Sequence, residues 1–241
     1  MESNTTMNPS YERRLSKTLP QVHDRIAEAT DASGREFDSV RLVAVTKAHP
    51  VEAVSAALAA GLTDLGENRV EELEKKVREF GRDFATWHMI GHLQSRKARR
   101  ASQLAHLIQS VDSVKLATRI SKFAQEQGVT VRILTQANTS GEHSKSGFDM
   151  ASAVDDILCV AEFPGIRVEG LMTMAPFGAD DKKLTSTFRA LRKIHGQLQA
   201  QGDAVGPELS MGMTNDFEIA IREGSTMVRV GTALFGARTR I

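Results

Sequence analysis

Short hydrophobic runs recur along the chain, and segments with helical character separate them. Eight runs can be identified, namely RLVAVT, LTDLG, TWHMIG, HLIQSV, VTVRILTQ, IRVEGLMTM, PELSM and TMVRVG. In some of the segments between them, apolar residues recur every three or four positions. Others begin with residue types that are typical of a helix start. Strands that alternate with helices pair in parallel through crossover connections, so the pattern predicts an α/β protein with a parallel sheet.

Three helices can be placed in more detail. Residues 11–34 form a helix ahead of the first run, and Pro20 is expected to kink it or to end it early. After the fourth run, Asp112 is expected to cap a helix that Gly128 ends, with an apolar face of Val114, Ala117, Ile120 and Phe123 or Ala124. After the sixth run, the apolar stripe of the helix includes Leu184, Phe188, Leu191 and Ile194.

Two architectures fit this order, a closed eight-stranded barrel and an open doubly wound sheet. Barrels of this kind have about 250 residues, and the chain has 241. The glycine pattern G-x-G-x-x-G of dinucleotide-binding sheets is absent after the first strand, and no Pro/Gly/Ser-rich linker divides the chain. We therefore predict one domain over residues 1–241, a single (β/α)8 TIM barrel with an extra N-terminal helix, in which residues 1–10 are expected to be disordered.

Composition and charge add mainly exclusions. The net charge of +1 creates no general field for nucleic acid or an anionic membrane. Cys159 is the single cysteine, which excludes a disulfide within the chain and favours a reducing compartment. The polar N-terminus resembles no signal peptide, and no stretch approaches the ~20 apolar residues of a membrane span. These features predict a cytoplasmic protein.

Lys47 follows the first strand, at the end of a barrel where active sites lie. By strand alternation it shares a face with Val43 and Val45, so its side chain can point into the barrel mouth. Burial there would lower the pKa of the amine and favour attack on a carbonyl to form a Schiff base. A solvated lysine at a strand end fits the pattern equally well.

Arg229 lies inside the eighth strand, on the face that points into the barrel. A buried guanidinium keeps its charge and needs a rigid acceptor. That acceptor is either an internal carboxylate, Glu67 or Glu169, or a ligand atom at the barrel centre.

The loops after the seventh and eighth strands are the expected anion site. Barrels commonly hold phosphate there, where backbone N–H groups and a helix N-terminus converge. Either Thr214 or Asn215 is expected to cap the helix after the seventh strand. Glycine and serine in such loops also make simple turns, but their coincidence with Arg229 and Lys47 favours phosphate. The residues of this expected cradle are Ser210, Met211, Gly212, Gly231 and Thr232.

Long stretches of the chain also resemble one known family, the pyridoxal phosphate homeostasis proteins of the YggS/PROSC type. The similarity runs from about residue 41 to residue 238 and rests on the motifs LVAVTKAHP, GENRVEEL, WHMIGHLQSRKAR, SGEHSKSGF, EGLMTMAP and LSMGMTNDFEIAIREGSTMVRVGTALFGAR. The resemblance implies a barrel like the N-terminal domain of alanine racemase (fold type III). It also implies pyridoxal 5'-phosphate (PLP), held as an internal aldimine on Lys47.

The resemblance implies roles for further residues. Arg229 is similar to the arginine that faces the pyridine nitrogen, and Asn68 to a residue close to the cofactor. The residues similar to phosphate ligands are Ser210, Gly231 and Thr232. The turn after Lys47 departs from the family, which often has a second lysine or a threonine where this chain has Ala48 and His49. Because a guanidinium keeps its proton, the pyridine nitrogen would stay unprotonated, which suits racemisation at most.

The sequence favours a PLP carrier over an enzyme, so no catalytic residue is assigned. A two-base racemase uses the lysine and a tyrosine on opposite faces of the substrate, and Tyr11, the single tyrosine, is expected to lie far from the strand ends. The resemblance implies a protein that buffers or delivers PLP and maintains vitamin B6 homeostasis, with apo-enzymes as recipients. A weak amino-acid racemase remains an alternative, with His88, His92 or His143 as the opposing base.

Other classes of function also fit single features of the sequence. A Schiff-base aldolase would use the lysine without PLP. A nucleic-acid site could use the basic run at residues 95–100, although this run is more typical of a solvated helix. His88 and His92 are four residues apart but lie on a strand that runs into a glycine, so they should diverge and no metal site is expected.

Lys145 lies in the glycine-flanked loop SGEHSKSGF and is either a gate that passes PLP on or part of a mobile surface loop. Replacing Lys145 with Ala should slow PLP transfer in the first case. The protein is expected to be a monomer.

Overall fold

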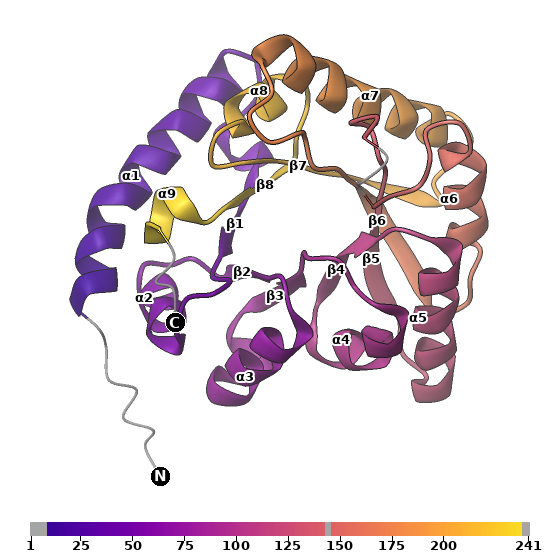
Figure 1. Ribbon diagram of the computed structural model, residues 1–241, viewed down its shortest axis with the longest axis horizontal. Coiled ribbons are helices and arrows are strands. Elements are labelled where there is room, and N and C mark those ends of the chain that lie inside the picture. Colours follow the sequence, from indigo (N-terminus) through magenta and orange to yellow (C-terminus); the bar gives the residue numbers. More distant parts are fainter. Residues whose placement is uncertain (1–8, 143–145, 238–241) are drawn as a thin grey trace.

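The barrel closes as the sequence predicts. A computed structural model describes residues 9–142 and 146–237. Its parallel strands lie side by side in chain order, and β8 pairs with β1 to complete the ring (Figure 1). The strands are β1 Arg41–Val45, β2 Asp64–Glu67, β3 Thr86–Met89, β4 Leu107–Val111, β5 Val131–Gln136, β6 Ile166–Met172, β7 Val205–Met213 and β8 Met227–Val230. The TIM barrel is confirmed, and the open sheet is excluded.

Helices surround the strands, as Figure 1 shows. The α-helices are α1 Pro9–Asp31, α2 Val51–Ala59, α3 Val70–Phe80, α4 Ala98–Leu104, α5 Val114–Gln127, α6 Ala153–Ala161, α7 Asp181–Gln199, α8 Phe217–Arg222 and α9 Thr232–Phe235. The described residues also form the short 3-10 helices η1 Phe37–Ser39, η2 Arg82–Phe84 and η3 Ser95–Lys97. The stripe predicted for α7 is buried against the barrel.

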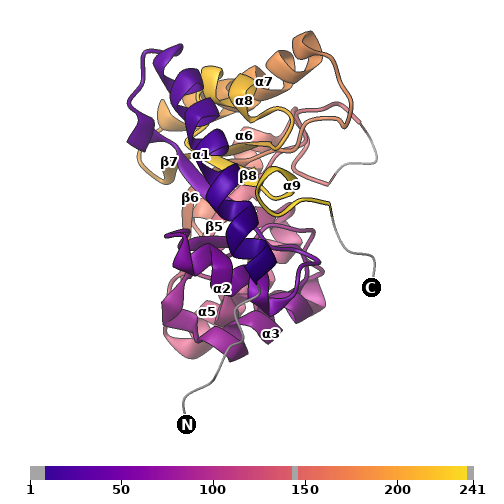
Figure 2. The ribbon, with the colours of Figure 1, turned by 90° about the vertical axis from the view of Figure 1, so that its left-hand side faces the viewer.

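The extra helix α1 lies outside the ring, against α2, α8 and α9 (Figure 2). It runs through Pro20 without a break, so the predicted early end is wrong. Proline removes one backbone hydrogen bond, and tertiary packing keeps the helix intact here, through the buried side chains of Leu15, Val22, Ile26 and Ala29. Of residues 1–10, for which disorder was expected, only Pro9 and Ser10 are described, and they begin α1.

Two predicted helix caps are wrong by one or two residues. Ser113, not Asp112, caps α5, and its hydroxyl accepts a hydrogen bond from the N–H of Leu116 at 3.3 Å. The cap position of α8 is Asp216, not Thr214 or Asn215. The predicted end of α5 is confirmed, since Gly128 has the left-handed conformation with φ 63°.

The core has an outer and an inner layer. The larger layer lies between the strands and the helices and includes Val228 and Val230. The smaller layer fills the barrel interior with Val43, Leu107, Leu134, Met172 and Met227. This alternation along β8 confirms that Arg229 lies on the interior face.

Candidate functional site

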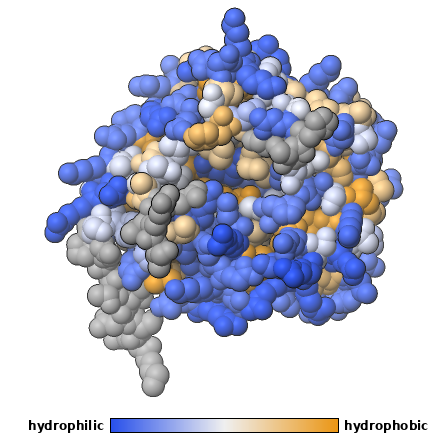
Figure 3. All heavy atoms as spheres, in the orientation of Figure 1, coloured by the Kyte–Doolittle hydropathy of each residue, from blue (hydrophilic) through white to orange (hydrophobic). Residues whose placement is uncertain are grey.

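A cavity of about 440 Å³ opens at the carboxyl ends of the strands. On the same face of the molecule, apolar atoms are visible near the middle and hydrophilic side chains surround them (Figure 3). The cavity wall brings together five of the residues that were predicted to bind a cofactor, namely Lys47, Asn68, Arg229, Gly231 and Thr232.

Lys47 lies on a turn that is fixed on both sides. The hydroxyl of Thr46 donates to Glu67 Oε1 at 2.5 Å, and Lys76 Nζ donates to the carbonyl oxygen of Thr46 at 2.7 Å. On the other side, the N–H of Ala48 donates to a carboxylate oxygen of Glu72 at 2.8 Å. Ala48 has φ 58°, a left-handed conformation that costs a non-glycine residue about 1–2 kcal/mol.

Glu67 and Lys76 form an ion pair below this turn, with their side chains 0% and 4% exposed and 2.5 Å between Oε1 and Nζ. Burial raises the pKa of Glu67, and the nearby Lys76 ammonium opposes that rise. The suggested partnership of Glu67 or Glu169 with Arg229 is wrong, because Glu169 pairs with Arg132 at the other end of the barrel.

Arg229 is held inside the barrel by neutral acceptors. One guanidinium nitrogen donates to the hydroxyl of Ser210 at 2.5 Å, and the other donates to the carbonyl oxygen of Thr173 at 2.9 Å. No carboxylate of the described residues lies within ion-pair distance. Burial lowers the pKa of Arg229 to about 10, against a smaller opposing effect of Asp216. The group is therefore a buried cation at neutral pH.

The wall after β7 lies further along the chain than the sequence indicated. Ser210 and Met211 are fully buried and, with Gly212, do not line the cavity. A Cβ on Gly212 would lie 2.8 Å from the Cα of Phe217, so this glycine permits close packing of β7 on α8. The strand continues to Met213 with an irregular register, two residues beyond the predicted end. The wall at this point consists of Met213, Thr214, Asn215 and Asp216.

The loops after β7 and β8 meet at this wall. The N–H of Ala233, in the first turn of α9, donates a long hydrogen bond of 3.4 Å to the hydroxyl of Thr214. A Cβ on Gly231 would lie 3.1 Å from the carbonyl oxygen of Val45, so a side chain there would press on β1. The expected junction of the two loops is therefore present, with different residues from β7.

Two parts of the wall, Asp216 and the loop of residues 174–179, were not found from the sequence, and His92 was singled out only as a possible opposing base. Asp216 is nearly buried, its carboxylate accepts from the N–H of Met213 at 2.5 Å, and burial raises its pKa. His92 reaches the wall and pairs with Asp112 at 3.0 Å. The loop of residues 174–179 also borders the cavity, and its Phe177 is 95% exposed. A phenylalanine just after a strand can be seen in the sequence. That Phe177 is exposed and borders the cavity became clear only from the fold.

Tyr11 is closer to Lys47 than expected. Its hydroxyl lies 3.0 Å from Nδ1 of His49, two residues after Lys47, because the first turns of α1 pack near this end of the barrel. The expectation that Tyr11 is remote is therefore wrong, although Tyr11 does not line the cavity. Burial raises its pKa, so the phenol stays protonated. His143 and Lys145 lie outside the described residues.

The two histidines and the basic run lie at different places in the fold. His88 is buried and His92 is exposed, so the two histidines diverge, and no cluster of three or more potential metal ligands occurs in the described parts of the chain. The basic run lies on η3 and α4, where Lys97, Arg99 and Arg100 pair with Glu71, Glu126 and Glu74. Among the helices described here, none is long and apolar enough to cross a membrane.

Comparisons with known proteins agree with this geometry. The profile of the family "alanine racemase, N-terminal domain" matches residues 19–239. A pyridoxal phosphate homeostasis protein of Pseudomonas aeruginosa is 39% identical over 93% of this chain and 96% of its own. One of Aquifex aeolicus is 36% identical over 91% and 96%. The structure of PipY from Synechococcus elongatus with PLP bound covers 88% of this chain and 100% of its own, with 37% identity and a TM-score of 0.77. The chain therefore belongs to the alanine racemase N-terminal domain family and, within it, to the pyridoxal phosphate homeostasis proteins.

Proposed function

We propose that this protein binds PLP in the cavity at the barrel mouth, attached covalently to Lys47, and that it buffers and delivers the cofactor. The observation that carries the proposal is the meeting of an amine, a buried guanidinium and a glycine-lined loop junction in one wall. The names of the relatives and the PLP bound to PipY support it. Such a role would maintain vitamin B6 and linked amino-acid homeostasis.

The residues present fit PLP by size and by chemistry. A cavity of about 440 Å³ lies within the range of roughly 300–1,000 Å³ that is usual for small ligands. We assign the covalent attachment to Lys47, the ring nitrogen to Arg229 and the phosphate to the junction of Thr214, Gly231 and Thr232. Asn68 lies in the same wall. When bound, PLP supplies an aldehyde and an electron-withdrawing ring.

The assignment of Ser210 differs from the one that the family resemblance implies. Its hydroxyl accepts from Arg229 and donates to Gln109 Oε1 at 2.6 Å, within the barrel. We therefore assign Ser210 to the support of Arg229, and not to the phosphate. Met211 and Gly212 are assigned to the packing of β7.

Weak racemase activity is a second candidate function, because His92 reaches the wall. Tyr11 does not reach it, so the tyrosine of a two-base racemase has no counterpart among the described wall residues. A carrier role needs no second base. Measuring the exchange of the α-proton of alanine in D₂O, with His92→Gln as the variant, separates the two roles: a carrier shows no exchange that depends on His92.

The first experiment is to purify the protein with PLP, record its visible absorbance, reduce it with borohydride and map the modified peptide. We expect a yellow protein with one pyridoxyl group on Lys47, and a colourless Lys47→Ala variant. The matched control is Lys182→Ala, which replaces an exposed lysine at the start of α7 and should stay yellow. Buffering and delivery are then tested by transfer of PLP to an apo-enzyme.

The opposite result has a definite meaning. A protein that takes up no added PLP would overturn the proposal. Borohydride trapping of a carbonyl substrate on Lys47 without PLP would then support a Schiff-base aldolase.

A further inference from the structure

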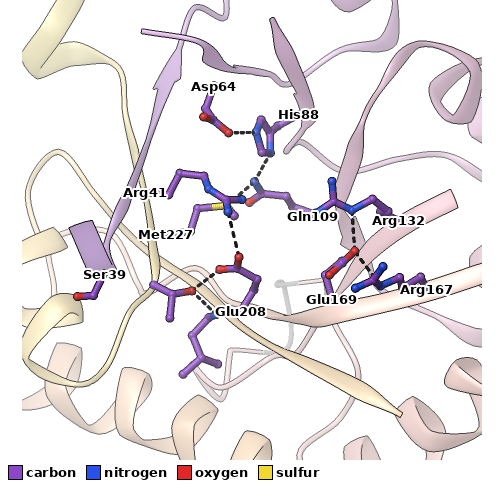
Figure 4. Close-up of polar contacts among 12 residues, drawn as sticks. Ser39, Arg41, Asp64, His88, Gln109, Arg132, Arg167, Glu169, Glu208 and Met227 are labelled. Atoms are coloured by element: carbon purple, nitrogen blue, oxygen red, sulfur yellow. Dashed lines mark hydrogen bonds and ion pairs between the residues drawn. The ribbon is translucent and has the colours of Figure 1, made fainter. Parts of the chain in front are cut away.

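An unbroken line of hydrogen bonds crosses the barrel interior from the cavity to the opposite end. Arg229 donates to Ser210 Oγ at 2.5 Å, and Ser210 donates to Gln109 Oε1 at 2.6 Å. Gln109 Nε2 lies 2.9 Å from His88 Nδ1, and His88 Nε2 lies 2.9 Å from Asp64 Oδ1. These five residues come from five strands, and we call them the interior chain. Figure 4 shows its far end, where His88 lies between Gln109 and Asp64.

The two ends of the interior chain fix the direction of every bond. A guanidinium only donates and a carboxylate only accepts, so each group between them must accept from the Arg229 side and donate toward Asp64. Gln109 therefore directs its carbonyl to Ser210 and its NH₂ to His88. It follows that the proton of the neutral imidazole of His88 resides on Nε2.

Burial makes these hydrogen bonds energetically important. His88, Gln109 and Ser210 are each 0% exposed, and Arg229 is 4% exposed. Hydrogen bonds polarise one another where the local dielectric is low, and an unpaired polar group there is costly. A carboxylate at one end thus makes the Ser210 oxygen a better acceptor for the guanidinium at the other.

At the end of the barrel opposite the cavity, Asp64 is the carboxylate that accepts the last hydrogen bond of the interior chain. The neighbouring cations of the barrel floor have acids of their own. Arg41 pairs with Glu208 at 3.3 Å, and Arg132 pairs with Glu169 at 2.6 Å (Figure 4). Asp64, at the start of β2, is left to His88 and also borders a small hollow open to solvent.

We propose that Gln109 and His88 are positioning residues for the cofactor, which act through Ser210 to hold the guanidinium of Arg229 in place, with Asp64 as the distant anchor. The proposal rests on the proposed function of the cavity. Without Gln109, the Ser210 hydroxyl loses the acceptor of its proton, so its oxygen is less polarised and less firmly held as an acceptor for Arg229. The carbonyl of Thr173 is then the acceptor of Arg229 that keeps its full strength.

The geometry itself is tested on the PLP-free protein by ¹⁵N NMR of the histidine ring nitrogens. We expect His88 as a neutral imidazole with its proton on Nε2. Asp64→Asn keeps an acceptor oxygen and should leave this tautomer unchanged. A proton on Nδ1 of His88 in the parent protein would contradict the direction of the hydrogen bonds in the interior chain and would overturn the proposal.

The effect on the cofactor is tested by titrating PLP into Gln109→Leu, which at similar volume removes the hydrogen bonds of Gln109 to Ser210 and His88 and its contact with the sulfur of Met227. We expect the dissociation constant to rise about tenfold, or about 1.4 kcal/mol, with borohydride still placing the pyridoxyl group on Lys47. Asp64→Asn keeps an acceptor but loses the charge, so it should weaken binding less than Asp64→Leu, which removes both. The matched control is Thr135→Val, which replaces a fully buried barrel hydroxyl that has no hydrogen-bond partner among the described residues and should leave PLP affinity unchanged.

A double-mutant cycle distinguishes positioning from general stability. If Gln109 acts through Arg229, then Gln109→Leu should change PLP affinity less than twofold in the Arg229→Gln background. An equal loss in both backgrounds would sink the proposal, as would a loss of thermal stability without any loss of affinity. If the parent protein itself binds no PLP, the proposed function fails, while the NMR measurement still decides whether the interior chain exists.

Discussion

The lysine at the barrel mouth is held in place by another lysine that is buried below it. Lys76 donates to the carbonyl oxygen of Thr46 and pairs with Glu67, so the residue before Lys47 is tied to α3 and β2 at once. Ion pairs of this kind contribute little net stability as a pair, but removing one partner leaves an uncompensated charge. The arrangement makes the turn sensitive to single substitutions.

We therefore expect Lys76→Met to lower the free energy of unfolding by about 3 kcal/mol, because Glu67 then stays buried without its partner. The double variant Glu67→Gln with Lys76→Met should recover more than half of that loss, since the amide introduced at this position carries no charge and can still accept from Thr46. Urea unfolding measures both. Lys75→Met, at an exposed neighbouring position of α3, is the control and should change stability by less than about 0.5 kcal/mol. A single variant as stable as this control would contradict the expectation.

Strand alternation was sufficient to place single residues, but not to find their partners. Counting by two along β1 and β8 put Lys47 at the mouth and Arg229 inside, because side chains of a strand alternate between faces. The partner of Arg229 could not be read in this way, since Ser210 and Thr173 come from other strands and their approach depends on barrel closure. Ser210 was expected near the end of its strand, facing the phosphate, whereas β7 continues past it to Met213.

At the scale of elements, α1 is tied to the loop that we assign to the phosphate. Arg25 donates to the carbonyl oxygen of Thr214 at 3.1 Å, pairs with Glu218 at 2.6 Å and stacks over the ring of Phe217 at 4.3 Å. One side chain thus fixes both the end of the loop after β7 and the first turn of α8. The extra helix is in this way part of the site.

Replacing Arg25 with Ala should weaken PLP binding about fivefold, or about 1 kcal/mol, because Thr214 loses its anchor. Pyridoxal, which lacks the phosphate, should be affected less. The control is Arg189→Ala, which removes an ion pair with Glu223 just past the end of α8 and should not distinguish the two ligands. An equal loss for PLP and pyridoxal in Arg25→Ala would mean that α1 does not act on the phosphate loop.

Elements were easier to predict than their ends. The eight strands are apparent in the sequence because strands covered on both faces read as continuous apolar runs. Caps were missed where several polar residues in a row compete, as in Asp112 and Ser113, and the geometry of the turn decides between them. The early end of α1 at Pro20 was predicted from the local cost of proline in a helix. Packing of α1 against α8 and α9 outweighs that cost.

For the whole molecule, we expect a monomer. Large exposed hydrophobic side chains of the described residues are few and come from separate segments, namely Phe37, Phe84, Val129, Met150 and Phe177. Stable interfaces need a contiguous apolar patch. We expect sedimentation equilibrium at micromolar concentration to give the mass of one chain. A dimer mass that Phe177→Ser returns to the monomer would instead assign an interface to the barrel mouth.

The pH dependence of stability should reflect the interior chain. Burial lowers the pKa of His88 below its ordinary value of 6.5, Asp64 opposes this shift, and Arg41 and Arg132 add to it. Between the lowered pKa and 6.5, the unfolded chain binds a proton that the folded chain does not. Stability therefore rises with pH across this window and falls on acidification. Buried Glu67 and Asp216, whose pKa values are raised, contribute the opposite slope, since the folded chain binds their protons more readily.

His88→Leu isolates the contribution of the imidazole. We expect the variant to be less stable than the parent at pH 7, because Asp64 and Gln109 lose their common partner. Its stability should nevertheless fall less steeply as the pH is lowered from 6.5, by at most about 1.4 kcal/mol per pH unit, the slope for one proton. Urea unfolding of both proteins at several pH values between 5 and 7 gives the two slopes. Parallel curves would show that His88 takes up its proton equally well in the folded and unfolded chain, in which case the imidazole could not be the neutral link that the chain from Arg229 to Asp64 requires.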